Sequence, residues 1–303
     1  GIWDWLTKNK DEIDFAYLNR PHIAIKYVDF IKKNTNIKVI YYGHDLHFLR
    51  EYREYELTGD IKKKRESDYW KSIEFSLMEK AAVSYYPSYV EEEAIHAIHP
   101  EYKIKAITAY VYEKFLENID KDFAKREGLL FVGGFAHPPN ADAVLWFAKE
   151  IFPLIRQKLD VNFYVVGSKV TDEIKELEQP GSGIIVKGFV TEEELASLYS
   201  TSRIVVVPLR YGAGVKGKVV EAVYNGAAIV TTSIGSEGIP EADRVMKVAD
   251  GPEAFADEVV KMYQDPAECR RMCEETQKYI REYFSVEAAW KVIEEYFTPE
   301  KER

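Results

Sequence analysis

The sequence predicts an α/β fold built from two parallel, doubly wound sheets, and three observations lead to this prediction. Short β-branched runs alternate with helical segments through the second half of the chain, an order typical of parallel sheets. The first half shows the same alternation with fewer strands. The length of 303 residues is sufficient for two domains of ordinary size. We therefore expect two domains, of which the first is incomplete.

The elements of the first half follow from its apolar runs. Four strands are predicted, at Ile13–Leu18, Ile37–Tyr42, Ala82–Tyr86 and Ile104–Ala109. Helical patterns predict helices at His22–Lys33 and Ile61–Lys80. We assign residues 1–115 to a partial N-terminal domain. The charged stretch 116–127 has no apolar periodicity and is expected to be a linker.

The second half has the clearer pattern and predicts a nucleotide-binding type of domain over residues 128–283. Six strands are expected, at Leu129–Val132, Asn162–Val166, Ile184–Lys187, Ile204–Val207, Ala228–Thr232 and Val245–Val248. Helices are expected between them, at Ala141–Phe152, Asp172–Glu178, Glu192–Ser200, Lys218–Asn225 and Pro252–Gln264. Thr191 and Glu194 form a capping box at one helix start. The last segment of the chain comprises residues 284–303.

Composition excludes several classes of protein. Hydrophobic residues make up 46% and charged residues 30% of the chain, as in soluble globular proteins. The net charge of −10 argues against a nucleic-acid partner, because a phosphate backbone needs basic surfaces to neutralise it. Cys269 and Cys273 exclude a disulfide framework, and we read them as small buried helix residues in a reducing cytoplasm rather than as a zinc or redox pair.

The most informative segment is a glycine-rich loop between the expected strand Ile204–Val207 and the helix that follows. Glycines allow a backbone to approach a ligand closely, and a helix start offers unpaired N–H groups to an anion. Lysines add positive charge there, while a carboxylate one turn into the helix suits the hydroxyls of a ribose. The loop and helix start carry Gly212, Gly214, Lys216, Gly217, Lys218 and Glu221. We favour a phosphate site over a surface helix start with ordinary charges.

GAGVKGKVVEA, followed by GAAIVTTSIGSEG, resembles the donor-site segment of glycosyltransferase family 4, the group 1 glycosyl transferases. The resemblance implies a GT-B fold, in which two Rossmann-like domains face one another, and a closing helix that crosses back to the first domain. Glu221 matches the second glutamate of the family's Glu-x7-Glu motif, which holds the nucleotide ribose. The first glutamate would fall on Ala213, where this chain departs from the pattern. Lys216 and Lys218 are expected to compensate.

Other stretches extend the resemblance. FVGGFAHPPNADAVLWF is similar to the family's first strand–loop–helix, which implies a diphosphate-facing turn at Gly133 and Gly134. The cations that many members carry after this turn are absent, so phosphate binding passes to the lysines and to Arg210. IIVKGFVTEEELASLY resembles the base-reading segment, and KVIYYGHDLHFLR a strand ending in a cleft-facing histidine. The resemblance thus adds His137, Asn140, Phe189 and Val190 as nucleotide-binding candidates and His44 as the catalytic candidate.

Three motifs have plainer explanations that we prefer. Asp120 and Asp122 form a DxD pair, but they lie in the charged stretch rather than at a strand end, so no metal is expected there. His44 and His47 lack further ligands for zinc. The basic run Lys62–Arg65 could attract anionic lipid, although a solvated helix end is the commoner reason for such a run.

Together these observations predict a glycosyltransferase that uses a nucleotide-diphosphate sugar and no cofactor, and the resemblance implies that transfer is retaining and metal-independent. The expected acceptor is a glycan, a lipid-linked sugar or a protein, in bacterial surface glycan synthesis, in the cytoplasm or at the inner face of the membrane. The base, the sugar and the acceptor stay open. The alternatives are a non-catalytic nucleotide-sugar-binding module and a sugar-nucleotide epimerase. The first expected domain begins mid-way, so self-association or upstream residues should cover its edge strand, and transfer by this chain alone should be weak.

Overall fold

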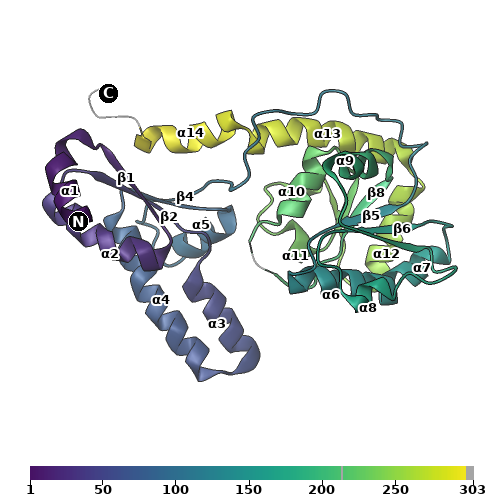
Figure 1. Cartoon of the computed structure of the whole chain (residues 1–303), viewed down its shortest axis with the longest axis horizontal. Helices are drawn as coiled ribbons and strands as arrows, with labels where there is room; N and C mark the ends of the chain where they lie inside the picture. The colour runs from purple at the N-terminus through teal and green to yellow at the C-terminus, as the bar shows by residue number, and fades with distance from the viewer. Residues whose placement is uncertain (213, 298–303) are drawn as a thin grey trace. The chain divides into compact units, whose positions relative to one another are not determined.

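The computed structural model describes residues 1–212 and 214–297, and the chain forms two compact units (Figure 1). Unit 1 comprises Gly1–Val111 and Val286–Arg303, and unit 2 comprises Tyr112–Ser285. The chain therefore passes from one unit to the other twice. Among the described residues, no helix combines the length and apolarity that a membrane crossing requires.

Unit 1 is built on a parallel sheet of four strands, as the sequence predicts. The strands lie in the order β1-β2-β3-β4. They are β1 (Phe15–Asn19), β2 (Lys38–Tyr42), β3 (Val83–Tyr86) and β4 (Ile104–Ala106). The registers of all three pairs are parallel. β1 is an edge strand of this sheet.

Helices cover both faces of this sheet. The helices of unit 1 are α1 (Ile2–Asn9), α2 (Pro21–Asn34), α3 (His47–Thr58), α4 (Ile61–Lys80), α5 (Tyr89–His96) and α14 (Val286–Phe297). One core cluster joins α2 and α4 to the sheet through Ala24, Val28 and Leu77. On the other face, α14 packs against Ile40 and Tyr85. The helix ranges predicted from the sequence did not include α1, α3 or α5.

Unit 2 contains a six-stranded parallel sheet in the order β10-β9-β8-β5-β6-β7. Its strands are β5 (Leu129–Val132), β6 (Phe163–Val166), β7 (Ile184–Gly188), β8 (Ile204–Val207), β9 (Ile229–Thr231) and β10 (Lys247–Val248). All six predicted strands are confirmed, with boundaries that differ by a few residues. When the strands of this unit are numbered along the chain, their spatial order is the one found in doubly wound dinucleotide-binding sheets. The direction in which successive strands are added therefore reverses between β5 and β8.

The helices of unit 2 lie on both faces of its sheet (Figure 1). They are α6 (Pro138–Trp146), α7 (Phe152–Arg156), α8 (Asp172–Lys175), α9 (Glu192–Thr201), α10 (Gly217–Tyr224), α11 (Ser233–Ser236), α12 (Pro252–Tyr263) and α13 (Pro266–Phe284). A π-helical turn, Phe147–Ile151, joins α6 to α7 where one helix was predicted. The predicted capping box of Thr191 and Glu194 is present at the start of α9.

The stretch 116–127, expected to be a linker, belongs to unit 2. Two of its side chains are buried and tie it down. Phe123 is 1% exposed, and the guanidinium of Arg126 lies 4.0 Å above its ring while donating to the carbonyl of Tyr199. The passages between the units lie instead at Val111 and Ser285. There Tyr112 bridges to Ser285, and its N–H donates to the carbonyl of Phe284 at 2.8 Å.

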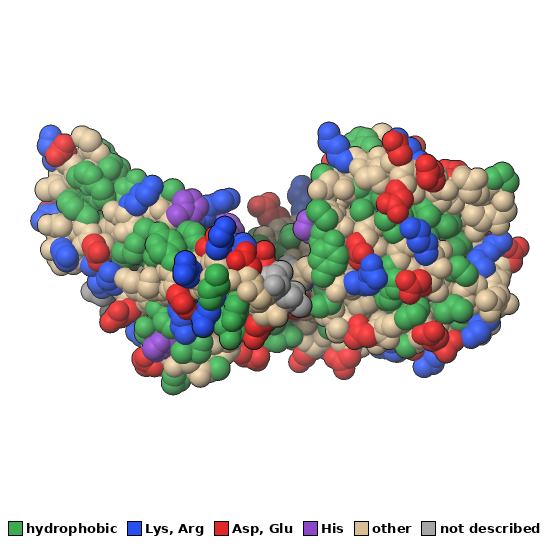
Figure 2. All heavy atoms as spheres, turned by 90° about the horizontal axis from the view of Figure 1, so that it is seen from below, with side chains coloured by type: hydrophobic (Ala, Val, Ile, Leu, Met, Phe, Trp, Pro, Cys, Tyr) green, Lys and Arg blue, Asp and Glu red, His purple; other side chains and the backbone are tan. Residues whose placement is uncertain are grey.

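The visible surface carries charges of both signs. Figure 2 shows acidic and basic side chains interspersed over each unit, without a continuous basic face in that view. This pattern, with the net charge of −10, gives no support for a nucleic-acid interface on that face.

Candidate functional site

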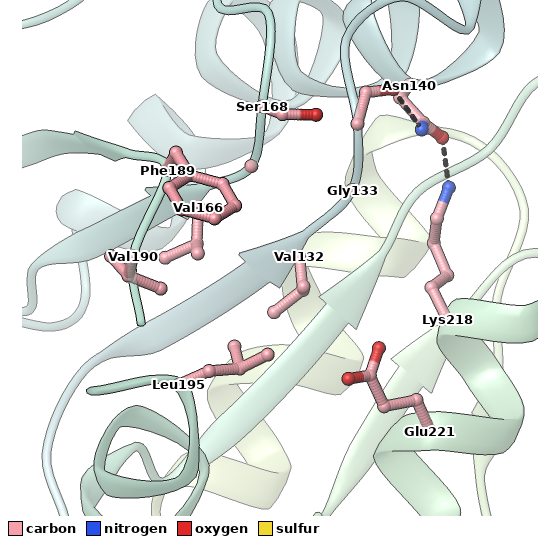
Figure 3. Close-up of a pocket in the computed structure, with 12 residues that line it drawn as sticks. Val132, Gly133, Asn140, Val166, Ser168, Phe189, Val190, Leu195, Lys218 and Glu221 are labelled. Atoms are coloured by element: carbon pink, nitrogen blue, oxygen red, sulfur yellow. Dashed lines mark hydrogen bonds between the residues drawn. The ribbon is translucent and has the colours of Figure 1, made fainter. Parts of the chain in front are cut away.

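A pocket of about 380 Å³ lies at the carboxyl ends of the unit 2 strands (Figure 3). Ligands of doubly wound sheets bind outside these strand ends, where strand order reverses. The volume is within the range of roughly 300–1,000 Å³ that small-molecule sites occupy. The pocket is lined by Val132, Gly133, Gly134, Asn140, Val166, Gly167, Ser168, Phe189, Val190, Leu195, Lys218 and Glu221.

Backbone hydrogen bonds hold the floor of this pocket together. The N–H of Gly133 donates to the carbonyl of Val166 at 2.9 Å, and the N–H of Gly167 donates to that of Gly188 at 2.8 Å. Gly167 adopts φ +156°, and a Cβ there would lie 1.9 Å from the carbonyl oxygen of Gly133. Only glycine allows this close approach of the two strand ends at the floor of the pocket.

Lys218 supplies the positive charge of the pocket. It lies in the first turn of α10, and its ammonium group donates to Oδ1 of Asn140 (Figure 3). Burial, with a smaller contribution from the positive charge of Lys216, lowers the pKa of Lys218 to about 8. A buried ammonium with a neutral partner is a group that an anionic ligand stabilises.

Glu221 lies one helical turn after Lys218 and lines the same pocket. Burial raises the pKa of its carboxyl group above the usual range. Figure 3 shows the carboxylate on the pocket side of α10, below the ammonium group of Lys218. The helix thus presents an amine and a carboxylate to one cavity, at positions suited to two different parts of one ligand.

The opposite wall is apolar and contains an exposed aromatic ring. Phe189 is 81% exposed, and it follows β7 beside Val190. Val132, Val166 and Leu195 complete this wall in Figure 3. An exposed ring beside an apolar pocket offers a flat surface to a planar ligand.

Several predicted residues lie near the pocket without lining it. Lys216 is the N-cap residue of α10, and its amine donates to the carbonyl of Gly214 and lies 3.2 Å from the carboxylate of Glu237. Gly217 is the first residue of α10. Ala213 lies outside the described residues.

Arg210 and His137 are also outside the lining. The guanidinium of Arg210 pairs with the carboxylate of Asp142, with Nε 2.9 Å from Oδ2. His137 is exposed and occupies the N-cap of α6 without a side-chain capping bond. The structure therefore assigns Arg210 a protein partner, whereas the sequence had suggested a phosphate.

His44 lies in unit 1, directly after β2. Its Nε2 is 2.6 Å from Oδ1 of Asn19, so the two side chains form a polar pair at the carboxyl end of that sheet. The next histidine, His47, is held by the buried carboxylate of Glu74 at 3.0 Å, which raises its pKa. The described residues contain no group of three or more side chains arranged to hold a metal ion.

The remaining motifs have structural roles. Asp120 accepts a hydrogen bond from the backbone of Asp122 at 2.9 Å, so the DxD pair shapes a turn. Burial raises the pKa of Cys269 to about 12, which keeps its thiol protonated. In the basic run, the amine of Lys63 lies within 3.2 Å of three glutamates, Glu51, Glu54 and Glu66.

Sequence reasoning missed six residues at this site. Five of them line the pocket, namely Val132, Val166, Gly167, Ser168 and Leu195, and the sixth, Glu237, pairs with Lys216. Ser168 could have been predicted, because it follows the carboxyl end of the expected strand Asn162–Val166, as Gly133 follows that of Leu129–Val132. Glu237 gave no signal, since its partner precedes it by 21 residues and lies in a loop.

A second pocket, of about 520 Å³, lies at the opposite ends of the same strands. It is lined by Gly128 and Asn162, which precede β5 and β6, and by Arg203 and Tyr263. The guanidinium of Arg203 lies 4.3 Å above the ring of Tyr263 and donates to the carbonyl of that residue at 3.0 Å. This pocket is larger, but the arginine that lines it is already bonded to backbone carbonyls of the protein.

Residues 126–265 match the family model of the group 1 glycosyl transferases. The matched segment contains all of the unit 2 sheet and all of the residues that line the pocket at its carboxyl ends. The match lies within unit 2, so this unit is similar to the group 1 glycosyl transferases.

One curated relative is an uncharacterized 44.6 kDa protein in the cps region of Klebsiella pneumoniae. It is 30% identical over 142 residues, which are 45% of this chain and 34% of the relative. The match thus spans about a third of the length of that relative.

Solved structures resemble the whole chain. TarM of S. aureus aligns with a TM-score of 0.68 and 14% identity over 95% of this chain and 56% of its own. Anabaena HepE in complex with UDP aligns with a TM-score of 0.69 and 13% identity over 97% of this chain and 81% of its own. Sucrose-phosphate synthase from Thermosynechococcus elongatus aligns with a TM-score of 0.68 and 15% identity over 96% of this chain and 78% of its own. At these identities the likeness shows the fold alone, which is the predicted GT-B type with two Rossmann-like domains.

Proposed function

We propose that this chain is the glycosyltransferase part of a protein that transfers a sugar from a nucleotide-diphosphate donor to an acceptor. One observation carries the proposal. Lys218 and Glu221 lie one turn apart on α10 and face a single preformed pocket at the point where strand order reverses. The amine of Lys218 can neutralise part of the charge of a diphosphate, and the carboxylate of Glu221 can accept hydrogen bonds from ribose hydroxyls.

The donor would lie along the strand ends. The diphosphate would lie between Lys218 and the Gly133–Gly134 turn, close to the first turn of α10, whose dipole and N–H groups favour an anion. The ribose hydroxyls would donate to Glu221. The base would lie against Phe189 and the backbone of Val190.

We further propose that transfer is retaining and needs no metal. In such a reaction the negative charge of the departing diphosphate is stabilised by the cations and oriented N–H groups of the pocket. Lys218 is the cation that lines the pocket, and Lys216 adds to the positive potential from the loop. His44 is the candidate residue of unit 1 for contact with the sugar being transferred.

The similar proteins suggest the first probes. HepE is described in complex with UDP, and the pneumococcal O-GlcNAc transferase GtfA in complex with UDP and GlcNAc. The Klebsiella relative lies in a cps region, which favours a role in bacterial surface polysaccharide synthesis and a glycan acceptor. Uridine diphosphate sugars are therefore the donors to test first.

A second candidate is a nucleotide-sugar-binding module that does not catalyse transfer. It is favoured by Ala213, because the family carries a glutamate at that place in the loop. Loss of a single acidic contact to the donor sugar would leave nucleotide binding intact and reduce transfer.

Two measurements test the proposal. A thermal-shift panel of UDP, GDP, ADP and their sugars should give an upward shift of several degrees for one base, since a ligand at about 100 times its Kd adds roughly 2.7 kcal/mol. Absence of a shift with every nucleotide contradicts the proposal. A radiolabelled-donor assay then separates transfer to glycan acceptors from binding alone and from conversion of the donor to an epimer.

A further inference from the structure

Asn140 lines the pocket and connects two of its parts, although its side chain is almost fully buried. It comes from α6 and is only 4% exposed. Its Nδ2 donates to the carbonyl of Gly134 at 2.7 Å, while its Oδ1 accepts from the ammonium group of Lys218. These two partners fix the orientation of the amide, because a carbonyl can only accept and an ammonium can only donate.

The amide also packs directly under the glycine turn. A Cβ at Gly133 would lie 3.0 Å from Nδ2 and 3.1 Å from Cγ of Asn140, so the turn rests on this side chain. One residue thus contacts both groups that would surround a diphosphate. Lys218 and Asn140 are 78 residues apart in the sequence, so the contact depends on the folded sheet.

We propose that Asn140 is a positioning residue, which holds the amine of Lys218 at the Gly133–Gly134 turn and so prepares the pocket for a diphosphate. The inference rests on the proposed function, since it concerns the same pocket. It gives Asn140 a role in addition to any direct contact with the nucleotide, because its amide nitrogen and oxygen each have a partner inside the protein.

The chemistry explains why an amide suits this place. A lysine side chain has many rotamers, and fixing one before binding removes part of the ordering cost from the binding step. An amide oxygen fixes the amine without neutralising it. A carboxylate would also hold it, but would cancel the charge that a phosphate needs and would repel the carbonyl of Gly134.

The titratable side chains that line the pocket are Lys218 and Glu221, with Lys216 as the charged neighbour that bears on Lys218. Because the pKa of Lys218 is about 8, diphosphate affinity of the parent should fall as pH rises from 7 to 9. An aspartate at position 140 would raise that pKa and remove this fall. A change that only loosened the fold would leave the pH profile in place.

The experiment compares Asn140→Ala, Asn140→Asp and, as a matched control, Asn162→Ala at the exposed opposite end of the sheet. Calorimetric titrations with UDP and with uridine are run from pH 6.5 to 9, after circular dichroism has verified folding. We expect Asn140→Ala to bind UDP about 3- to 10-fold more weakly, with uridine unchanged. Asn140→Asp should bind UDP at least as weakly, without a decline between pH 7 and 9. The control should match the parent.

Two results would overturn the inference. One is a folded Asn140→Ala protein that binds UDP as the parent does. The other is an Asn140→Asp protein with the pH profile of the parent. Failure of the parent to bind UDP, GDP or ADP would instead contradict the proposed function. A Lys218→Met protein that loses UDP binding while Asn140→Ala keeps it would leave the proposed function standing and reject the positioning role alone.

Discussion

The two ends of the unit 2 sheet each carry a pocket, and they differ in where their charged groups find partners. At the amino ends, the guanidinium of Arg203 donates to the carbonyls of Arg126, Tyr263 and Ala124 at 2.7, 3.0 and 2.9 Å. At the carboxyl ends, Lys218 has the neutral amide of Asn140. Burial shifts the pKa values of Lys218 and Glu221 in the directions that disfavour their charged forms.

The volumes of the two pockets do not indicate which of them binds a charged ligand. The larger pocket, of about 520 Å³, is lined by Arg203, whose guanidinium is already bonded to backbone carbonyls. The smaller pocket, of about 380 Å³, is lined by Lys218 and Glu221, and burial disfavours the charged forms of both. An anionic ligand would stabilise the charged form of Lys218 and so offset the free-energy cost of burying it. Four measurements test this difference between the two pockets.

Lys218→Met should have the largest effect. The variant removes the cation that lines the carboxyl-end pocket, and we expect UDP affinity to fall by about 2–4 kcal/mol, with uridine affinity nearly unchanged. Calorimetric titration measures both. Lys149→Met removes an exposed lysine paired with Glu173 at 3.1 Å and serves as the control. Equal UDP affinity in parent and Lys218→Met would place the phosphate elsewhere.

Glu221→Ala should cost about 1.5–3 kcal/mol of nucleotide affinity, because a carboxylate that accepts from ribose hydroxyls is lost. The loss should be smaller for 2′-deoxy-UDP than for UDP, since the deoxy ligand lacks one of the hydroxyls. Titration of both ligands against parent and variant gives the coupling directly. An identical loss with both ligands would mean that Glu221 does not contact the 2′-hydroxyl.

Arg203→Met tests the other end of the sheet. Its three carbonyl partners would lose a charged donor, and we expect the free energy of unfolding to fall by about 1–3 kcal/mol with UDP affinity unchanged. Urea denaturation and calorimetry measure the two quantities. A variant of full stability that no longer binds UDP would reverse the roles assigned to the two pockets.

The smallest expected effect is that of pH on the parent protein. The folded-state pKa of Lys218, about 8, lies below that of an unfolded chain, so the folded state releases this proton first as pH rises. This group should therefore make the ligand-free protein more stable as pH passes from 8 towards 10. UDP should bind with uptake of a proton near pH 8, and calorimetry in buffers of different ionisation enthalpy detects it. No proton uptake would contradict the lowered pKa.

The unit 2 fold was within reach of sequence reasoning because its signals are local. Each strand is a short apolar run, and the loop of Gly212 and Gly214 adopts positive φ at both glycines, as a close approach requires. The pocket followed from these runs, since carboxyl ends of parallel strands meet at one edge. Lys218 and Glu221 were placed correctly in that pocket by their position at one helix start.

Side-chain pairings were beyond sequence reasoning, because they depend on distances between remote segments. Nothing local indicates that Arg210 pairs with Asp142, or that Lys216 contacts Glu237. In unit 1, α1 gave a weak signal because none of its residues is buried. The stretch 116–127 looked like a linker, since a buried arginine and one phenylalanine leave no periodic pattern.

The bridge between Tyr112 and Ser285 bears on how this protein can be taken apart. Unit 2 is one uninterrupted segment of chain whose first and last residues are neighbours, while unit 1 is assembled from both sides of it. Adjacent ends are the property that lets a domain be grafted into the loop of a host or circularly permuted. The pocket at the carboxyl ends of the unit 2 strands lies wholly within that segment. We therefore expect residues 112–285 to tolerate circular permutation or insertion into a host protein.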